Sequence, residues 1–176
     1  LSVSLGQGLL RADKLTGVIF GGALRATAAT TITSRPRMET VLALEDVNIA
    51  QTTRALAGGK MGLQVSLNSA GGNVSDLISG LSGKGSLRLN GINVQKGKNG
   101  TMLAGALGLV SAMNQVSRLS SDKGKSAGLV DIAGSFMIRR GIATSSDIRI
   151  MSGLGEGTAE GVIDLPRWDI DFKGNV

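Results

Sequence analysis

Carboxylates and glycines supply the few patterns in this chain that could perform chemistry. Asp164 and Asp169 flank Pro166, and two nearby carboxylates are the usual equipment for acid–base catalysis. The proline turn between them, without a hydrophobic pocket pattern around it, favours turn-stabilising or solvated carboxylates instead. Glu45 and Asp46 could contact a hard cation, but two adjacent carboxylates do not make a calcium loop.

A glycine-rich run at 153–157 superficially resembles a phosphate-binding loop. It lacks the Gly-Lys-Ser/Thr ending, and no helical pattern follows it, so a nucleotide site is not expected. Arg139 and Arg140 precede a hairpin turn at Gly141, where solvated side chains are expected. None of these patterns therefore predicts a catalytic, cofactor or metal site.

The amino-acid composition excludes most enzyme chemistry. The chain contains no His, no Cys and no Tyr. The usual general bases, the thiol nucleophile and nearly all zinc or copper sites are thereby removed. We predict a non-enzymatic protein without a cofactor. The absence of Cys forbids disulfides and says little about the compartment.

The net charge of +6 raises the question of an anionic partner such as nucleic acid or a membrane. Single-strand binding needs aromatic stacking platforms, and aromatic residues make up 2% of the chain. No helix-turn-helix, zinc-finger or RNP motif is visible. We therefore predict no nucleic-acid partner and interpret the basic residues as solvated strand faces and loop tips.

The length and glycine content favour one domain built from hairpins. The 176 residues suffice for a single domain at 1–176, and 41% of them are hydrophobic. The 27 glycines are roughly twice the average usage, and many stand at predicted strand ends. The chain opens inside an alternating apolar and polar run, which predicts a piece of a longer protein.

Three helices are expected between the strands. The first covers 48–57, and the second follows the cap Asn73 with a stripe from Val74 to Leu81 and is stopped by Gly83 and Gly85. The most apolar segment, 101–118, is the third helix, packed on a sheet or in contact with lipid. Asn90-Gly91 is expected to form a type I′ hairpin turn.

Alternating apolar residues predict strands with one buried face. They predict a mainly β fold with minor α, in which a curved, half-open antiparallel sheet carries two or three short helices packed on or capping it. The candidates for its apolar inner face, as groove or as core, are Leu63, Val65, Leu67, Leu87, Leu89, Phe136 and Ile138. The sequence does not separate core packing from lipid contact among them.

Three blocks of the sequence resemble the C-terminal region of the AsmA family of bacterial envelope proteins. The middle block is Ser75-Asp76-Leu77, Leu81-Ser82-Gly83-Lys84-Gly85 and Leu87-Arg88-Leu89-Asn90-Gly91-Ile92. The last block, at 136–165, runs from Phe136 through Arg140-Gly141-Ile142-Ala143 and Asp147-Ile148 to Gly155-Glu156-Gly157 and Asp164-Leu165. The block upstream, at 20–24, is Phe20-Gly21-Gly22-Ala23-Leu24, an aromatic-Gly-Gly turn. After Ile92 the chain continues Asn93-Val94-Gln95-Lys96, where the family often has Gly-Ile-Asp-Leu.

The resemblance implies a function that the residues alone do not. It implies a periplasmic domain of an inner-membrane-anchored protein that supports phospholipid or lipopolysaccharide transport and outer-membrane assembly. A groove lined by Leu, Val, Ile and Phe would hold acyl chains, since each buried methylene contributes about 0.8 kcal/mol. The alternative is a structural or protein-interaction domain with a fully packed core, no lipid site and envelope proteins as partners.

Overall fold

The computed structural model describes residues 2–51, 58–92, 129–153 and 155–175. These residues form ten strands, one α-helix (α1) and one 3₁₀ turn (η1). The elements are β1 Ser2–Gly6, β2 Leu9–Ile19, β3 Gly22–Thr31, β4 Arg37–Asn48, η1 Ile49–Gln51, β5 Lys60–Ala70, α1 Val74–Ser79, β6 Ser82–Ile92, β7 Val130–Arg139, β8 Ile142–Ser152, β9 Gly155–Asp164 and β10 Asp169–Asn175.

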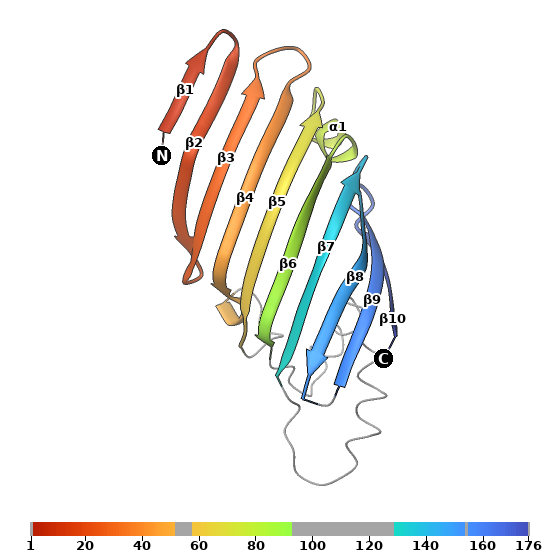
Figure 1. Cartoon of the computed structure of the whole chain (residues 1–176). Coiled ribbons are helices and arrows are strands. Elements are labelled where there is room, and N and C mark those ends of the chain that lie inside the picture. The colour runs from red at the N-terminus through yellow and green to blue at the C-terminus, as the bar shows by residue number, and fades with distance from the viewer. Residues whose placement is uncertain (1, 52–57, 93–128, 154, 176) are drawn as a thin grey trace.

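All ten strands belong to one antiparallel sheet in which spatial order follows chain order from β1 to β10. Every strand pairs with its neighbours in sequence, and β1 does not pair with β10, so the sheet is not closed. Figure 1 shows the strands as an inclined, twisted array whose last members, β8 to β10, turn away from the plane of β1 to β7. The mainly β, open antiparallel fold predicted from the sequence is confirmed.

Three of the hairpins turn on two residues, as the glycine positions predicted. Gln7-Gly8, Phe20-Gly21 and Arg140-Gly141 each have positive φ at both positions, between 46° and 77°. This is the backbone of a type I′ turn, whose twist matches that of the strands it joins. Positive φ costs a residue with a Cβ roughly 1–2 kcal/mol at the first turn position, whereas the glycine at the second position adopts it without that cost.

Four β-bulges recur, one in each of β2, β4, β6 and β8. The register shifts between Ala12 and Leu15, between Leu44 and Val47, between Leu89 and Ile92, and between Ser145 and Ile148. Each bulge inserts one extra residue, so the side chains on either side of it return to the same face of the sheet. Without the extra residue, every apolar side chain beyond the bulge would point to the opposite face.

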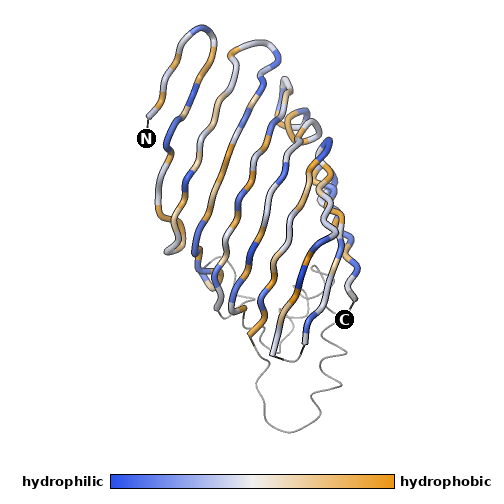
Figure 2. Tube along the Cα trace, viewed as in Figure 1, coloured by the Kyte–Doolittle hydropathy of each residue, from blue (hydrophilic) through white to orange (hydrophobic). Residues whose placement is uncertain are grey.

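The two faces of the sheet differ in polarity. Residues opposite one another in register share a face, and one such row crosses all ten strands. It consists of Val3, Ala12, Ala28, Thr40, Leu67, Gly83, Ile138, Ala143, Ile163 and Ile170. We call the side that carries this row the apolar face and the other side the polar face. Figure 2 shows the resulting alternation of hydrophobic and hydrophilic residues along the strands.

Few side chains in the described residues are fully buried. Buried apolar residues number eight: Val47, Ile49, Val65, Ile92, Ile132, Ile138, Ala143 and Ala159. Ile49, Ile92 and Ile132 form a cluster against which Met61, Leu89 and Val130 pack. Apart from neighbouring strands, the described elements in substantial contact are α1 and β5. The described sheet is therefore a single layer with α1 over one end of it.

Helix α1 begins as its sequence predicted. The Asn73 side chain accepts a hydrogen bond from the Asp76 amide at 2.9 Å, and the Asp76 carboxylate accepts from the Gly72 amide at 3.3 Å. The hydroxyl of the buried Ser69, on the apolar face of β5, donates to the Leu77 carbonyl. Because Ser69 shares its face with Val65, the helix covers the apolar side of the sheet.

The expectation of two or three short helices is not met in the described residues. In the predicted helix 48–57, Ile49–Gln51 is a 3₁₀ turn and 52–57 lie outside the described residues, as does the whole of 101–118. Helix α1 stops at Ser79 with Gly80 as its C-cap, and Gly83 and Gly85 instead lie inside β6. An alternating strand pattern begins directly after Leu81, and pairing with β5 and β7 outweighs the local glycine signal.

The predicted hairpin turn at Asn90-Gly91 was wrong. Both residues lie within β6, at the bulge between Leu89 and Ile92. Gly91 has φ +63°, which suits a turn and a bulge equally. Its amide donates to the Asp131 carboxylate at 2.6 Å, so a side chain of β7 supplies the partner that the broken strand pairing does not.

Candidate functional site

All seven candidate residues lie on the apolar face. The register pairs Leu63 with Leu87 and places Leu89 opposite Met61. Gly85 connects Val65 to Phe136, because it is opposite both of them in its two neighbouring strands. Leu67 is connected to Ile138 through Gly83 in the same way, so the seven form one contiguous patch over β5, β6 and β7.

Within this patch, burial separates two residues from the rest. Val65 is 8% exposed and Ile138 is 6% exposed, so both are packed by their neighbours. Leu63, Leu67, Leu87, Leu89 and Phe136 are half-buried. These five retain surface that an apolar ligand could cover.

Aromatic rings fill the space above glycines on the apolar face. A Cβ added at Gly85 would lie 2.5 Å from Cζ of Phe136, the residue opposite it on β7. A Cβ at Gly161 would likewise collide with the ring of Phe172, its partner on β10. A phenyl ring over a cross-strand glycine restores the contact area that the glycine lacks. The apolar face thus stays continuous where the sequence places small residues.

The apolar face extends to both edges of the sheet. Val3 and Leu5 on β1 are 56% and 67% exposed, and Ile170 on β10 is 49% exposed. Leu10 and Leu15 on β2 are also exposed on this face. The same apolar–polar alternation marks these edge residues, which are not among the seven candidates.

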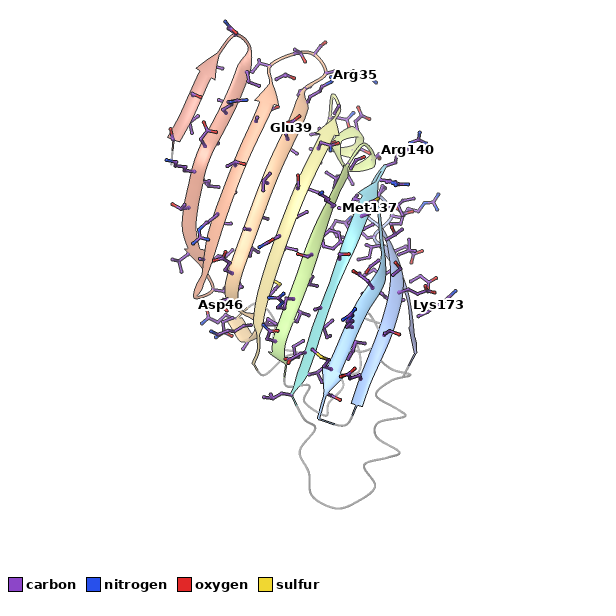
Figure 3. The ribbon with its side chains drawn as sticks, in the orientation of Figure 1. Arg35, Glu39, Asp46, Met137, Arg140 and Lys173 are labelled. Atoms are coloured by element: carbon purple, nitrogen blue, oxygen red, sulfur yellow. The ribbon has the colours of Figure 1, made fainter. Side chains whose placement is uncertain are left out.

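An open depression of about 1330 Å³ lies elsewhere, across β4 to β10. Most of its lining residues belong to the polar face, with Val65 and Phe136 also at its border. Four exposed apolar side chains line it, namely Val41, Met137, Ile142 and Val162. Its charged residues are Lys84, Arg139 and Lys173 with Asp147, Glu160 and Asp171. Figure 3 shows where Met137 and Lys173 lie in the sheet.

The mixed lining of this depression suits a polar or amphipathic ligand better than an acyl chain. Its three cations and three anions balance, so it has no net attraction for either sign of charge. An acyl chain placed there would desolvate charged groups without pairing them, which costs free energy. The predicted groove lined by Leu, Val, Ile and Phe therefore corresponds to the apolar face and not to this depression.

Asp147 is the titratable group in the depression with a defined electrostatic environment. Its carboxylate accepts hydrogen bonds from the Ser135 hydroxyl at 2.6 Å and the Ser135 amide at 2.8 Å. These two bonds, and a weaker one from the Ser145 hydroxyl, lower the pKa of Asp147 below its ordinary value. Because all the partners flank the β8 bulge, the carboxylate has a structural role that accounts for its shift.

The carboxylates considered as candidates for acid–base catalysis form structural hydrogen bonds. Asp164 and Asp169 are opposite each other in register, but Asp164 accepts from the Arg167 amide at 3.1 Å and Asp169 from the Ile170 amide at 3.0 Å. Asp164 also lies 3.9 Å from the Arg167 guanidinium. They stabilise the β9–β10 turn, as the proline between them suggested.

Glu45 and Asp46 each pair with a cation of the protein. Arg25 contacts Glu45 at 2.9 Å, and the Lys60 amine lies 3.8 Å from Asp46. Within the described ranges, no group of three or more acidic, His or Cys side chains is placed to hold a metal ion.

A scan against protein-family models, a search of curated proteins and a search of solved structures each find no match to this chain. In the part of the chain that the structure describes, no helix is both long enough and apolar enough to cross a bilayer.

Proposed function

We propose that this domain is a non-enzymatic module of the bacterial cell envelope that handles phospholipid or lipopolysaccharide on its apolar face. In this proposal it is the periplasmic part of an inner-membrane-anchored protein of the AsmA type and supports outer-membrane assembly. The observation that carries the proposal is the ten-strand apolar face of an unclosed sheet, over which the described residues place only α1.

The chemistry of the apolar face fits acyl chains. The row that crosses all ten strands contains one polar residue, Thr40, and ends in exposed Val3 and Ile170. With strands about 4.8 Å apart, the face is about 43 Å wide. Fully burying about ten methylenes at about 0.8 kcal/mol each would contribute roughly 8 kcal/mol before the cost of immobilising the chain, so a single open layer holds an acyl chain more weakly than that.

Adjacent residues of β5 give a matched test of which face binds lipid. Leu63 lies on the apolar face, and Gln64 lies on the polar face, where Ser86 is its cross-strand neighbour. A photo-reactive benzoylphenylalanine replaces either Leu63 or Gln64, and each variant is irradiated with phospholipid and with lipopolysaccharide. We expect lipid adducts in the mass spectrum from Leu63 and from the second apolar-face position Leu87, and none from Gln64 or Ser86.

Two results would overturn the proposal. One is equal cross-linking from both faces. The other is the absence of lipid from gently extracted protein, combined with no uptake of a fluorescent fatty acid. Thermal melts of each variant identify any substitution that unfolds the sheet, and Leu87 provides the second apolar-face position if Leu63 does not tolerate the larger side chain.

Among the described strands, β1 has an uncharged outer edge, which favours a second candidate function, a docking module for envelope proteins. Exposed strands are usually protected from pairing by charges, proline or bulges. Ser2–Gly6 has none of these, whereas β10 carries Asp169, Asp171 and Lys173. In this alternative, β1 would add a partner strand to the sheet.

Single cysteines distinguish this alternative, because the chain has no Cys of its own. A cross-linker on Ser4→Cys should give one defined adduct with an outer-membrane assembly protein, and the same linker on Asp171→Cys should give none. Identical products from the two edges would exclude specific strand addition at β1.

A further inference from the structure

Three strongly exposed apolar side chains from separate segments lie at one end of the sheet. Trp168, in the turn between β9 and β10, is 80% exposed, and Val74, at the start of α1, is 71% exposed. Ile32, just after β3, is 58% exposed. All three stand at the end of the sheet where β3, β5, β7 and β9 finish.

Backbone hydrogen bonds join the turns at this end into one continuous rim. The Gly71 amide donates to the Pro36 carbonyl at 3.1 Å, which links the β3–β4 connection to the segment before α1. The Gly141 amide donates to Leu81 at 2.8 Å, and the Leu165 amide donates to Gly141 at 2.9 Å. We call the segments 32–37, 71–81, 139–142 and 164–169 the turn rim.

The turn rim is basic. It carries five arginines, all of them exposed: Arg35, Arg37, Arg139, Arg140 and Arg167. Its acidic residues are Asp76, Asp164 and Asp169. Asp76 accepts a hydrogen bond from the Gly72 amide and Asp164 from the Arg167 amide. Asp164 also pairs with the Arg167 guanidinium, and five arginines against three carboxylates leave the rim with a net positive charge. Figure 3 shows Arg35 and Arg140 at this end and Asp46 at the opposite end.

Positive φ occurs at two non-glycine rim positions, at Arg140 as part of its type I′ turn and at Trp168 in the β9–β10 turn. Arg140 has φ +51° and Trp168 has φ +55°. Glycine or asparagine adopts this left-handed region at lower cost, by roughly 1–2 kcal/mol per residue. No packing compensates at Trp168, since most of its surface is open to solvent. Trp168 is therefore an exposed tryptophan held in a turn next to Arg167.

We propose that the turn rim docks onto the surface of a bilayer that contains anionic phospholipid. Tryptophan prefers the membrane–water interface because its ring is apolar and its N–H remains hydrated. Arginines near a negatively charged leaflet each add attraction that falls off within a Debye length. This inference goes beyond the proposed function, since it concerns contact with the membrane surface and does not require acyl chains on the apolar face.

The chain carries its own reporter for this contact. Trp168 is the single Trp and there is no Tyr, so the intrinsic emission of the whole protein reports the environment of the rim. We expect the emission of the intact protein to shift to the blue with vesicles of phosphatidylglycerol and phosphatidylethanolamine. Brominated acyl chains should quench it. Pure phosphatidylcholine vesicles should have little effect, and high salt should weaken the response.

Two double arginine variants test how much the rim arginines contribute to vesicle affinity. Replacing Arg139 and Arg140 with Ser should weaken vesicle affinity about fivefold for each residue, roughly 30-fold together, which corresponds to about 1 kcal/mol per basic residue near the surface. Arg88 and Arg149 are the control, because both are exposed and lie on the polar face between the two ends of the sheet. Replacing that pair with Ser removes the same charge and should leave the affinity nearly unchanged.

Three results would overturn the proposal. They are an unchanged Trp168 emission with anionic vesicles, an equal loss of affinity in the two arginine pairs, and the same emission shift with a soluble polyanion such as heparin. Co-sedimentation of Trp168→Ala with vesicles tests the ring by a second measurement and should show reduced binding. Photo-cross-linking at Leu63 is independent of these readouts, so failure of docking and failure of lipid binding on the apolar face are distinguishable.

Discussion

The Asp147 carboxylate holds the β8 bulge in place, and its removal is the most informative test of the sheet geometry. It accepts three hydrogen bonds, from the amide and the hydroxyl of Ser135 on β7 and from the hydroxyl of Ser145. The bulge between Ser145 and Ile148 returns Ile148 to the face that carries Ala143. The substitution Asp147→Ala therefore removes the contacts that favour the extra residue at this position.

The structure sets the size of the expected effect. A buried hydrogen bond to a charged group contributes roughly 1.5–3 kcal/mol. Asp147 and Ser135 are exposed, so water replaces part of what the substitution removes. We expect a loss of about 1 kcal/mol in the free energy of unfolding, which lowers the melting temperature by about 2–4 °C for a chain of this length.

The pH dependence of this loss follows from the lowered pKa of Asp147. A carboxyl group whose pKa is lower in the folded protein stabilises it above the unfolded value, about 3.9. That stabilisation is lost as the pH falls through the folded value. The difference between wild type and Asp147→Ala should be full at pH 7 and should shrink below about pH 4.

Thermal melts at pH 7 and pH 3 check both statements. Asp171→Ala is the control, because Asp171 lies on the same face and in the same depression and accepts no hydrogen bond that holds a bulge. Amide hydrogen exchange should show faster exchange at Ser135 in Asp147→Ala. A penalty that is the same at both pH values, or an equal penalty in Asp171→Ala, would refute the reasoning.

Two further substitutions test the packing of the turns and of α1. Gly22→Ala should lower the melting temperature by about 3–10 °C, because its Cβ would lie 2.5 Å from the Glu45 carbonyl oxygen and overpacking costs about 1–3 kcal/mol. Gly17→Ala is the control and should be close to neutral, because the nearest atom to its Cβ would be 3.8 Å away. Equal melting temperatures for the two variants would contradict this account. Asn73→Ala should accelerate amide exchange in the first turn of α1 by about fivefold, since an N-cap contributes about 1 kcal/mol. Ser75→Ala on the exposed side should not, and protection that persists in Asn73→Ala would mean that packing alone holds the helix.

The strand content and the apolar face could be predicted from the sequence, because both depend on local alternation. Leu63, Val65 and Leu67 alternate without interruption, and their face follows from the period of a strand. The x-Gly hairpins were predictable in the same way, since Gly8, Gly21 and Gly141 supply positive φ where two strands must reverse. These features depend on neighbouring residues alone.

The bulges and the fate of Asn90-Gly91 could not be predicted, because both depend on the partner strand. A glycine at positive φ suits a turn or a bulge, and the amide of Gly91 is satisfied by Asp131 on another strand. At the β8 bulge, the local signal is a change in alternation: the apolar-face residue before Asp147 is at an odd position (Ala143), and those after it are at even positions (Ile148 and Ile150). The depression on the polar face likewise depends on side chains brought together from seven strands.

The regular placement of the bulges defines how a sheet of this kind can change its length. Each of β2, β4, β6 and β8 carries one extra residue, and each pairs with an odd-numbered strand that has none. A unit of one bulged and one regular strand therefore keeps its apolar side chains on the same face of the sheet as those of its neighbours. A whole unit could be inserted or deleted without inverting the remaining strands, whereas a single strand could not. Gene segments that encode one bulged and one regular strand are therefore the natural increments by which such a surface would be widened or narrowed, in evolution or by engineering.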